Sequence, residues 1–155
     1  MTAGKKTKNP WLRRILIALL VIVVILAGIY WYVATEKFSD TNSRKADYTV
    51  NALDLIREFV SNDTGANKKY TEKIITVNGK VSELEAPDTS TVNVKFTDPS
   101  TGSFIIFAFQ DSHLSEGKTL KVGDSVSIKG SCSGGSYSPA LELTKIDFKR
   151  AALNK

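Results

Sequence analysis

The stretch Lys73–Leu84, KIITVNGKVSEL, decides how the C-terminal two-thirds of this chain is expected to fold. Its β-branched residues favour a strand, and Gly79 interrupts that strand near its middle. A glycine inside a long strand is typical of a bulge or a sharp bend, which lets one strand serve two sheets of a small barrel. We therefore expect a bent first strand here.

Four further strands are predicted downstream of this stretch. Thr91–Thr97 (TVNVKFT) alternates strictly, which places Val92, Val94 and Phe96 inward. The other segments are apolar or alternating runs: strands at Ser103–Phe109, Ser125–Gly130 and Ala140–Phe148, a short helical turn at Ser112–Glu116, and a loop at Ser131–Pro139. Five strands, with a longer connection between the third and the fourth, predict a mainly β, five-stranded OB-like Greek-key barrel.

An amphipathic helix is expected before the first strand, over Thr49–Ser61. Thr49 is the predicted N-cap, and Gly65, in the polar stretch that follows, is the predicted stop. The apolar stripe of this helix has the spacing i, i+3, i+7 at Leu53, Ile56 and Val60. Such a stripe needs a partner surface, and we expect it to pack on the β barrel.

Several of these segments together resemble the bacterial tRNA-anticodon-binding-like OB-fold family. The resemblance covers about 47–150 and rests on six short motifs: Ala52-Leu53, Asn62-Asp63, Ala66–Tyr70, Val77–Val81, Val122–Gly130 and Leu141–Phe148. It implies the OB fold, and it implies an exported or membrane-attached protein of unassigned activity. Relatives are expected to carry a disulfide, but Cys132 is the single cysteine of this chain.

The N-terminal part contains an uncharged run of 20 residues, Ile15–Ala34. At about 1.5 Å per residue this run spans about 30 Å as a helix, which matches the hydrocarbon core of a bilayer. Trp11 lies at one end and Tyr30–Tyr32 at the other, where aromatic rings favour the headgroup level. The sequence predicts a single transmembrane helix. A cleaved signal peptide is the alternative, but the run is long and no small-x-small site ends it; a core helix of a soluble protein is disfavoured because the run lacks a polar face.

Charge predicts the orientation of this helix and the organisation of the chain. Five lysines and arginines precede the helix, without an acidic residue, and such clusters stay in the cytoplasm. We expect a cell-membrane protein with a cytoplasmic N-terminus and a periplasmic or extracellular C-terminal domain. The predicted segments are a basic tail (1–14), the transmembrane helix (15–34), a polar linker (35–47), the OB-like domain (48–150) and a C-terminal tail (151–155).

The net charge of +5 does not describe the predicted domain. After the five basic residues of the tail, 16 lysines and arginines face 16 aspartates and glutamates, so the rest of the chain is formally neutral. A neutral domain attracts phosphates weakly, and this disfavours nucleic acid as a partner. The expected partners are the bilayer, through 15–34, and a protein, peptide or saccharide that the sequence does not identify.

Candidate ligand-contacting residues come from the usual binding face of an OB barrel. They are Asn93 and Lys95 on the second predicted strand and Tyr137 in the last loop. Phe107 and Phe109 could stack on bases, but burial is favoured for both because their strand is apolar on both faces. Two function classes therefore remain: a tethered binding module, expected to use barrel loops such as Ala86–Ser90 and Ser131–Pro139, and a single-stranded nucleic-acid-binding domain.

No pattern of residues in the sequence predicts an enzyme, a cofactor or a metal site. The lone histidine, His113, follows Asp111 and Ser112, but neighbours in sequence do not form a catalytic triad, and a surface or capping role is favoured. Cys132 is interpreted as a small apolar residue. One histidine and one cysteine are too few for a metal site without carboxylates gathered around them.

Overall fold

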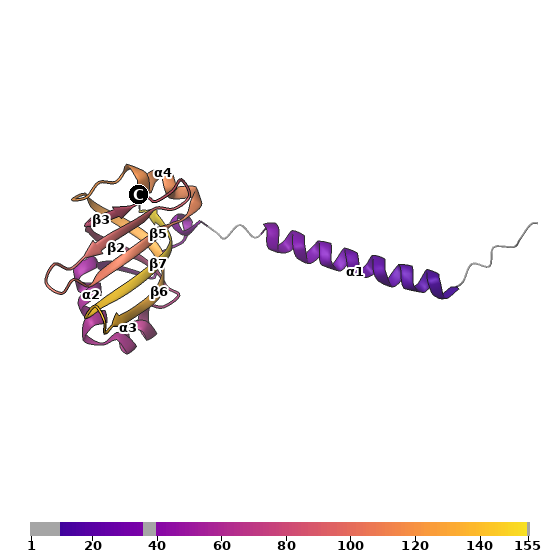
Figure 1. Ribbon diagram of the computed structural model, residues 1–155, viewed down its shortest axis with the longest axis horizontal. Helices are drawn as coiled ribbons and strands as arrows, with labels where there is room; N and C mark the ends of the chain where they lie inside the picture. The colour runs from indigo at the N-terminus through magenta and orange to yellow at the C-terminus, as the bar shows by residue number, and fades with distance from the viewer. Residues whose placement is uncertain (1–9, 36–39, 155) are drawn as a thin grey trace, which may run out of the picture. The chain divides into compact units, whose positions relative to one another are not determined.

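The computed structural model describes residues 10–35 and 40–154, and the chain divides into two compact units, 1–38 and 39–155 (Figure 1). The first unit contains the helix α1, Pro10–Thr35. Proline suits the first position of a helix because the N–H that it lacks would have no helical partner there. The predicted basic tail lies largely outside the described residues, since Lys5, Lys6 and Lys8 precede residue 10.

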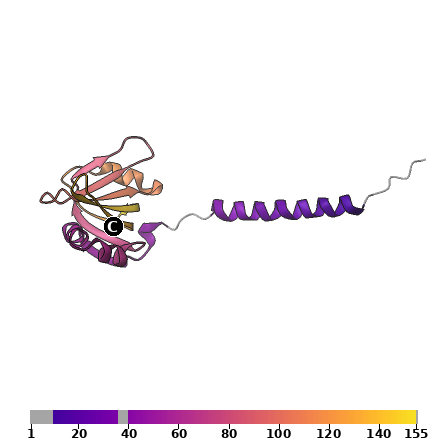
Figure 2. The same ribbon diagram turned by 60° about the horizontal axis from the view of Figure 1, so that its bottom comes forward.

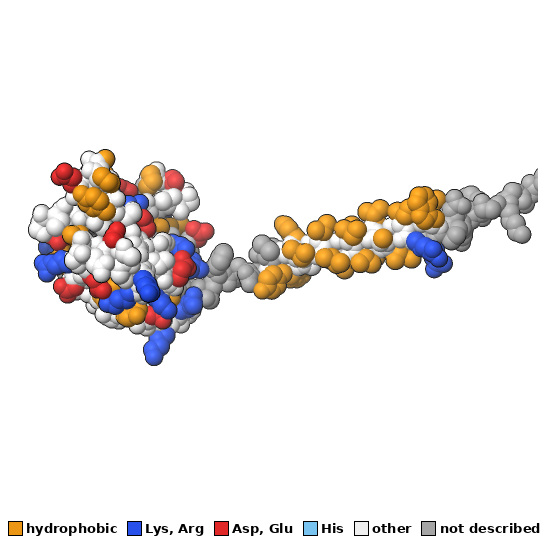
Figure 3. Space-filling view, turned by 90° about the horizontal axis from the view of Figure 1, so that it is seen from below, with side chains coloured by type: hydrophobic (Ala, Val, Ile, Leu, Met, Phe, Trp, Pro, Cys, Tyr) orange, Lys and Arg blue, Asp and Glu red, His pale blue; other side chains and the backbone are white. Residues whose placement is uncertain are grey.

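Helix α1 exposes an apolar surface along its length. Its segment Trp11–Tyr32 has 22 residues, none of them buried, and it is long and apolar enough to cross a membrane. Figure 3 shows apolar side chains along this helix, with basic side chains near the end where Arg13 and Arg14 lie. A helix that is apolar all round is typical of a membrane span or of a protein core.

The second unit is built on a sheet of seven strands, where the sequence predicted five. The strands are β1 (Tyr48–Asn51), β2 (Ile74–Lys80), β3 (Glu83–Glu85), β4 (Asn93–Thr97), β5 (Phe104–Phe109), β6 (Ser125–Ser138) and β7 (Leu143–Leu153). Their order in the sheet is β1-β2-β6-β7-β5-β4-β3. The count is higher because the predicted first strand is divided into β2 and β3, and because β1 is added in parallel beside β2.

The barrel closes between β2 and β3. The N–H of Val81 bonds to the carbonyl of Asp124, which leads into β6, whereas the N–H of Ser82 bonds to the carbonyl of Lys95 on β4. Two successive residues therefore hydrogen-bond to β4 and to the segment that leads into β6, which are not neighbours in the sheet. This confirms that the first strand bends, but the turning point is Val81–Ser82 and not Gly79.

Gly79 instead allows Phe96 and Ala52 to pack closely against β2. A Cβ atom at this position would lie 2.6 Å from Cδ2 of Phe96 and 2.8 Å from Cβ of Ala52. Any side chain would therefore push apart β2, β4 and the helix that begins at Ala52. The interruption of the strand by a glycine reflects the approach of that helix.

Two helices, and not one, precede β2. The predicted Thr49 cap is wrong, because Tyr48–Asn51 is a strand; α2 is Ala52–Ser61, and its cap is Asn51, whose Oδ1 accepts the N–H of Leu53 at 3.0 Å. The predicted stop at Gly65 is also wrong, because Gly65 lies inside α3, Asp63–Tyr70. Asn62 ends α2 and caps α3 through a bond from the Gly65 N–H to its Oδ1.

Helix α2 packs on the barrel with a face rotated from the predicted stripe. Leu53 and Val60 are 37% and 47% exposed, whereas Ile56 is fully buried. The buried face has the spacing i, i+3, i+4, i+7 and consists of Ala52, Leu55, Ile56 and Phe59. Helices α2 and α3 lie at one end of the barrel, and α4 (Leu114–Thr119) lies at the other (Figures 1 and 2).

The last two strands are longer than predicted. The expected loop at Ser131–Pro139 is mostly strand, because β6 extends to Ser138 and pairs with β7, with two register shifts along the pair. Strand β7 continues to Leu153, with Ala151 and Ala152 fully buried, so ordered structure extends past the predicted end of the domain at 150. The predicted short helical turn after β5 is confirmed as the 3-10 turn Asp111–His113 followed by α4.

The core lies inside the barrel, and the inward residues of the predicted alternation are confirmed. Val92, Val94 and Phe96 are at most 1% exposed. Phe107 packs against Phe96 and Phe148 with both ring-centroid distances at 5.0 Å. Phe107 and Phe109 are buried, as the apolar strand indicated, and neither ring is available for stacking on a base.

Residues 40–47, in the predicted linker, are packed on the barrel. Thr41 begins a 3-10 turn, Thr41–Ser43, and is 1% exposed. The Nζ of Lys129 donates to the carbonyls of Asn42 and Arg44 at 3.1 and 3.2 Å, and Asp47 exchanges two hydrogen bonds with Ile74. Residues 36–39 of the predicted linker lie outside the described residues.

Candidate binding site

The outer face of β4 and β5 is the surface on which the sequence placed its ligand contacts. Register partners run across four strands of this face, from Glu83 through Lys95 and Ile106 to Asp147. Asn93 lies two residues from Lys95 on the same side of β4 and is half-buried. The structure therefore brings Asn93 and Lys95 together, next to β3.

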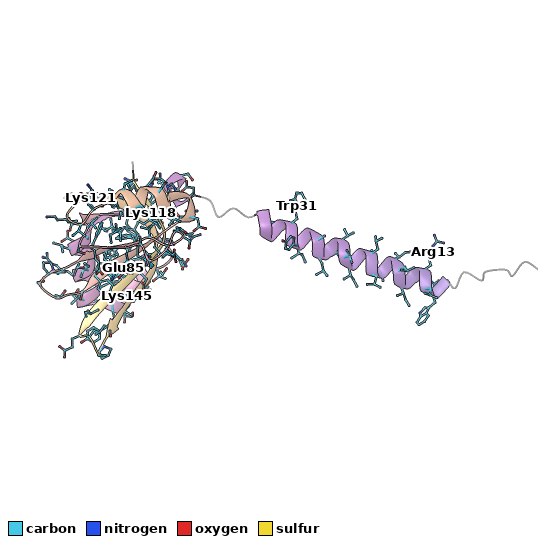
Figure 4. All side chains as sticks on the ribbon, turned by 45° about the horizontal axis from the view of Figure 1, so that its top comes forward. Arg13, Trp31, Glu85, Lys118, Lys121 and Lys145 are labelled. Carbon is cyan, nitrogen blue, oxygen red and sulfur yellow. The ribbon has the colours of Figure 1, made fainter. Side chains whose placement is uncertain are left out.

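Carboxylates neutralise the lysines of this face. The Nζ of Lys95 lies 3.2 Å from Oε2 of Glu83 and 2.5 Å from Oε1 of Glu85, and the side chain is 17% exposed. The hydrogen bond that Lys95 donates to Glu85 raises the pKa of Lys95. Lys145 is paired with Asp147 at 2.8 Å. Figure 4 labels Glu85 and Lys145 of this face, and Lys118 and Lys121 near α4.

Five charged side chains of this face form ion pairs with one another: Glu83 and Glu85 with Lys95, and Asp147 with Lys145. A surface that binds a nucleic-acid backbone needs lysines and arginines that are free to replace counterions. Tyr137, the third predicted contact, lies on β6 near its end and is 54% exposed. It pairs in register with Thr144 on β7, whereas Asn93 and Lys95 lie on β4.

A second surface, a groove of about 880 Å³, lies beside the start of α2. Its lining comes from β1, β2, β4, β6, the turn between β2 and β3, the loop after β4 and the first residues of α2. The apolar part consists of Ala52, Leu53, Gly79, Val81, Phe96, Pro99 and Val126, and the polar part of Asn51, Asn78, Lys80, Ser82, Thr97, Ser125 and Ser127. Volumes of this size are typical of sites for small molecules or short peptides.

Sequence reasoning missed the groove. Lys80 and Ser125 are register partners on β2 and β6, but they lie far apart in the chain, and no local pattern relates them. Gly79 is the only signal in the sequence, because a glycine in a strand often marks a close approach of another segment. That segment is the start of α2, which forms one wall of the groove.

His113 is buried and lies between two carboxylates. Its Nε2 is 2.8 Å from Oδ1 of Asp40, and its Nδ1 is 3.1 Å from Oε2 of Glu116. The surface role that the sequence favoured is wrong, because His113 is buried; the capping role holds in position only, because His113 is the N-cap residue of α4 but makes no side-chain cap hydrogen bond. Asp40 is 73 residues away in the chain, so the sequence did not identify it as a partner. The Asn42 N–H and the His113 ring both bond to Asp40, and they lower the pKa of Asp40.

Cys132 belongs to the core. It is fully buried, and burial raises the pKa of its thiol to about 11, so it is a thiol at neutral pH. Among the described residues, no group of three histidine, cysteine, aspartate or glutamate side chains is arranged to hold a metal ion.

Comparison with known proteins identifies the family. The model of the family described as tRNA_anti-like matches residues 1–143. The chain belongs to the tRNA_anti-like family. The OB-like fold of its second unit, with a first strand that changes partners and a helix between β5 and β6, agrees with this membership.

A solved structure of low sequence identity shows a similar fold. A proposed nucleic acid-binding lipoprotein from Klebsiella pneumoniae is 16% identical, with a TM-score of 0.53 over 68% of this chain and 91% of that chain. Asparaginyl-tRNA synthetases from Entamoeba histolytica and Pyrococcus horikoshii are each 16% identical, with TM-scores of 0.36 and 0.37; this chain covers 20% of each. The synthetase scores are too low to support an argument. A search among curated proteins finds no match.

Proposed function

We propose that this tRNA_anti-like protein is a membrane-anchored, non-enzymatic binding module. Helix α1 anchors it, and the OB-like unit lies on the outer side of the membrane. The observation that carries the anchor is the unburied apolar surface of Trp11–Tyr32. The five basic residues before Ile15 support the orientation, since basic clusters resist translocation.

The binding part of this proposal rests on the groove beside α2. The groove combines an apolar wall with amide and hydroxyl groups, which is the usual composition of a ligand site. The outer face of β4 and β5 supports the alternative of single-stranded nucleic acid poorly, because Lys95 and Lys145 are already paired with carboxylates.

Labelling of an introduced cysteine tests the anchor and its orientation. Cys132 is buried and should not react, so Ser115→Cys on exposed α4 and Thr2→Cys in the tail can each be followed without removing it. We expect a membrane-impermeant maleimide to label Ser115→Cys in intact cells, and Thr2→Cys only after permeabilisation. The wild type is the unlabelled control.

Extraction of membranes at alkaline pH completes this test. An anchored protein stays in the pellet, whereas a cleaved or peripheral one is released. Release of the protein, or labelling of Thr2→Cys in intact cells, would contradict the proposed anchor.

A further inference from the structure

We infer that residues 40–46 form a strap that detaches from the barrel while the barrel stays folded, and that detachment lengthens the tether between α1 and the domain. The strap includes the 3-10 turn Thr41–Ser43 and ends before Asp47. The change of length requires a chain that α1 holds in a membrane, so this part of the inference rests on the proposed function.

Asp47 is the residue at which the backbone hydrogen bonding of the domain begins. Its N–H donates to the carbonyl of Ile74 at 2.7 Å, and its carboxylate accepts the N–H of Ile74 at 2.9 Å. In the described part of the chain, no backbone–backbone hydrogen bond joins residues 40–46 to the barrel. The strap can therefore detach up to Asp47 without the loss of a hydrogen bond of the sheet.

The strap makes little apolar contact with the barrel. Its sequence, DTNSRKA, has one apolar side chain, Ala46, which is half-buried. Thr41 is its one buried residue, and the hydrophobic core of the described domain contains no residue of the strap. Segments with few buried apolar contacts open at a small part of the free energy of global unfolding. The core is therefore expected to stay intact when the strap detaches.

Two side chains of the barrel hold the strap. The Nε2 of His113 lies 2.8 Å from Oδ1 of Asp40. The Nζ of Lys129 on β6 donates to the carbonyls of Asn42 and Arg44 at 3.1 and 3.2 Å. These contacts are polar, so water can replace them, whereas buried apolar contacts have no such replacement.

Both side chains keep or gain a partner when the strap detaches. The Nδ1 of His113 lies 3.1 Å from Oε2 of Glu116 on α4, and this contact does not involve the strap. Lys129 is half-buried with the strap in place, so its ammonium group contacts water once the strap has left. Detachment therefore avoids the large cost of a buried polar group without a partner.

Detachment changes the reach of the domain. Asp40 follows Thr35, the end of α1, by five residues, and a chain of this length spans at most about 17 Å. With the strap detached, the free chain extends to Asp47, twelve residues after Thr35, and spans up to about 40 Å. The binding module then reaches ligands farther from the bilayer than the attached strap allows.

Thiol labelling of the full chain in lipid nanodiscs measures the detachment. Thr41→Cys places a thiol at a position that is 1% exposed, and Cys132, fully buried in the barrel, reports global unfolding in the same molecule. With an excess of maleimide at neutral pH, we expect Thr41→Cys to react at least about 100-fold faster than Cys132. Mass spectrometry of the peptides separates the two sites.

Matched variants distinguish the strap from the barrel. Lys129→Met should accelerate the labelling of Thr41→Cys about tenfold, because it removes two hydrogen bonds from a charged donor. Lys118→Met, at a lysine that donates to a carbonyl away from the strap, should leave that rate unchanged. Gly135→Ala, which disturbs the packing of the barrel, should accelerate the labelling of Cys132 and leave Thr41→Cys unchanged.

Trypsin gives a second measurement without a change in the strap itself. Cleavage after Arg44 or Lys45, both exposed on the strap, requires the backbone there to leave the barrel. Lys129→Met should accelerate this cleavage about tenfold, and Gly135→Ala should not. This measurement decides the detachment even if Thr41→Cys does not fold.

Energy transfer to a rhodamine-labelled lipid headgroup measures the reach. A donor dye is placed first on Ser115→Cys, which is exposed, and N-ethylmaleimide then modifies Thr41→Cys in the same chain. The modified side chain no longer fits its buried position, so the strap stays detached and energy transfer should fall. The Ser115→Cys protein without Thr41→Cys, treated in the same way, is the control.

Three outcomes overturn the inference. Equal labelling rates for Thr41→Cys and Cys132, both raised by Gly135→Ala, make the strap part of the cooperative barrel; the proposed function then stands. A detached strap with unchanged energy transfer removes the change of length. If the chain leaves the nanodiscs, the anchor and the change of length fail together, and the labelling rates still decide the detachment.

Discussion

His113 is the residue through which two distant parts of the chain meet. It lies at the end of the turn after β5, and its two ring nitrogens contact Asp40 and Glu116. Asp40 begins the segment 40–47 that is packed on the barrel. The contact between the His113 Nε2 and the Asp40 Oδ1, at 2.8 Å, ties this segment to the turn after β5.

Asp40→Asn should lower the free energy of unfolding at neutral pH by about 1 kcal/mol, because the side chain of Asp40 is 44% exposed and solvent screens its interactions. The pKa of Asp40 is lowered in the folded state from 3.8, so the ionised carboxylate stabilises the fold above about pH 4. That contribution is lost as the pH falls below 4 through the lowered pKa.

Urea unfolding of the wild type and the variant at pH 7, 4 and 2 measures this effect. The difference between the two proteins should be largest at pH 7 and smallest at pH 2. Asp111→Asn, at an exposed position of the neighbouring turn, is the control and should change the free energy of unfolding little. A difference for Asp40→Asn that stays constant with pH would contradict the assignment.

At the scale of elements, α2 packs closely on β6 because Gly135 of β6 has no side chain. A Cβ atom at Gly135 would lie 2.5 Å from Cδ1 of Phe59 and 3.2 Å from Cγ1 of Ile146, and both neighbours are fully buried. Asn67 on α3 adds two hydrogen bonds to the backbone of Gly135, each 2.8 Å long. The glycine-rich segment after Cys132 is therefore part of strand β6, and residues of α2 and α3 contact it.

Gly135→Ala should destabilise the domain by about 1–3 kcal/mol, because the added methyl group overpacks the contact with Phe59. Ser136→Ala, at the exposed neighbouring position, is the matched control and should have little effect. Urea unfolding followed by circular dichroism gives both values. A stability of Gly135→Ala equal to that of the wild type would show that α2 can move away without cost.

At the scale of the whole molecule, the positive charge and the OB domain are separate features. The excess of lysine and arginine lies in the first 14 residues, and the remainder is formally neutral. Within the domain, the lysines of the outer β4–β5 face are paired with carboxylates. Membership of a family whose name refers to tRNA therefore does not by itself indicate a surface for phosphates.

Lys95→Gln should change the affinity for a single-stranded oligonucleotide by less than about twofold at 150 mM salt, because Lys95 is already neutralised by Glu83 and Glu85. Filter binding across a salt series measures it. If Lys95 did contact a phosphate, the variant would bind more weakly, and the slope of affinity against salt would fall by about one.

The sequence by itself determined the apolar helix, the neutral domain and the inward residues of β4, because these depend on local composition and on the two-residue period of a strand. Tertiary structure alone decided the change of partners at Val81–Ser82, the contact of His113 with Asp40, and the groove beside α2. Each of these joins segments far apart in the chain. Such contacts depend on the closure of the barrel and on the packing of helices on it, so a local sequence pattern does not predict them.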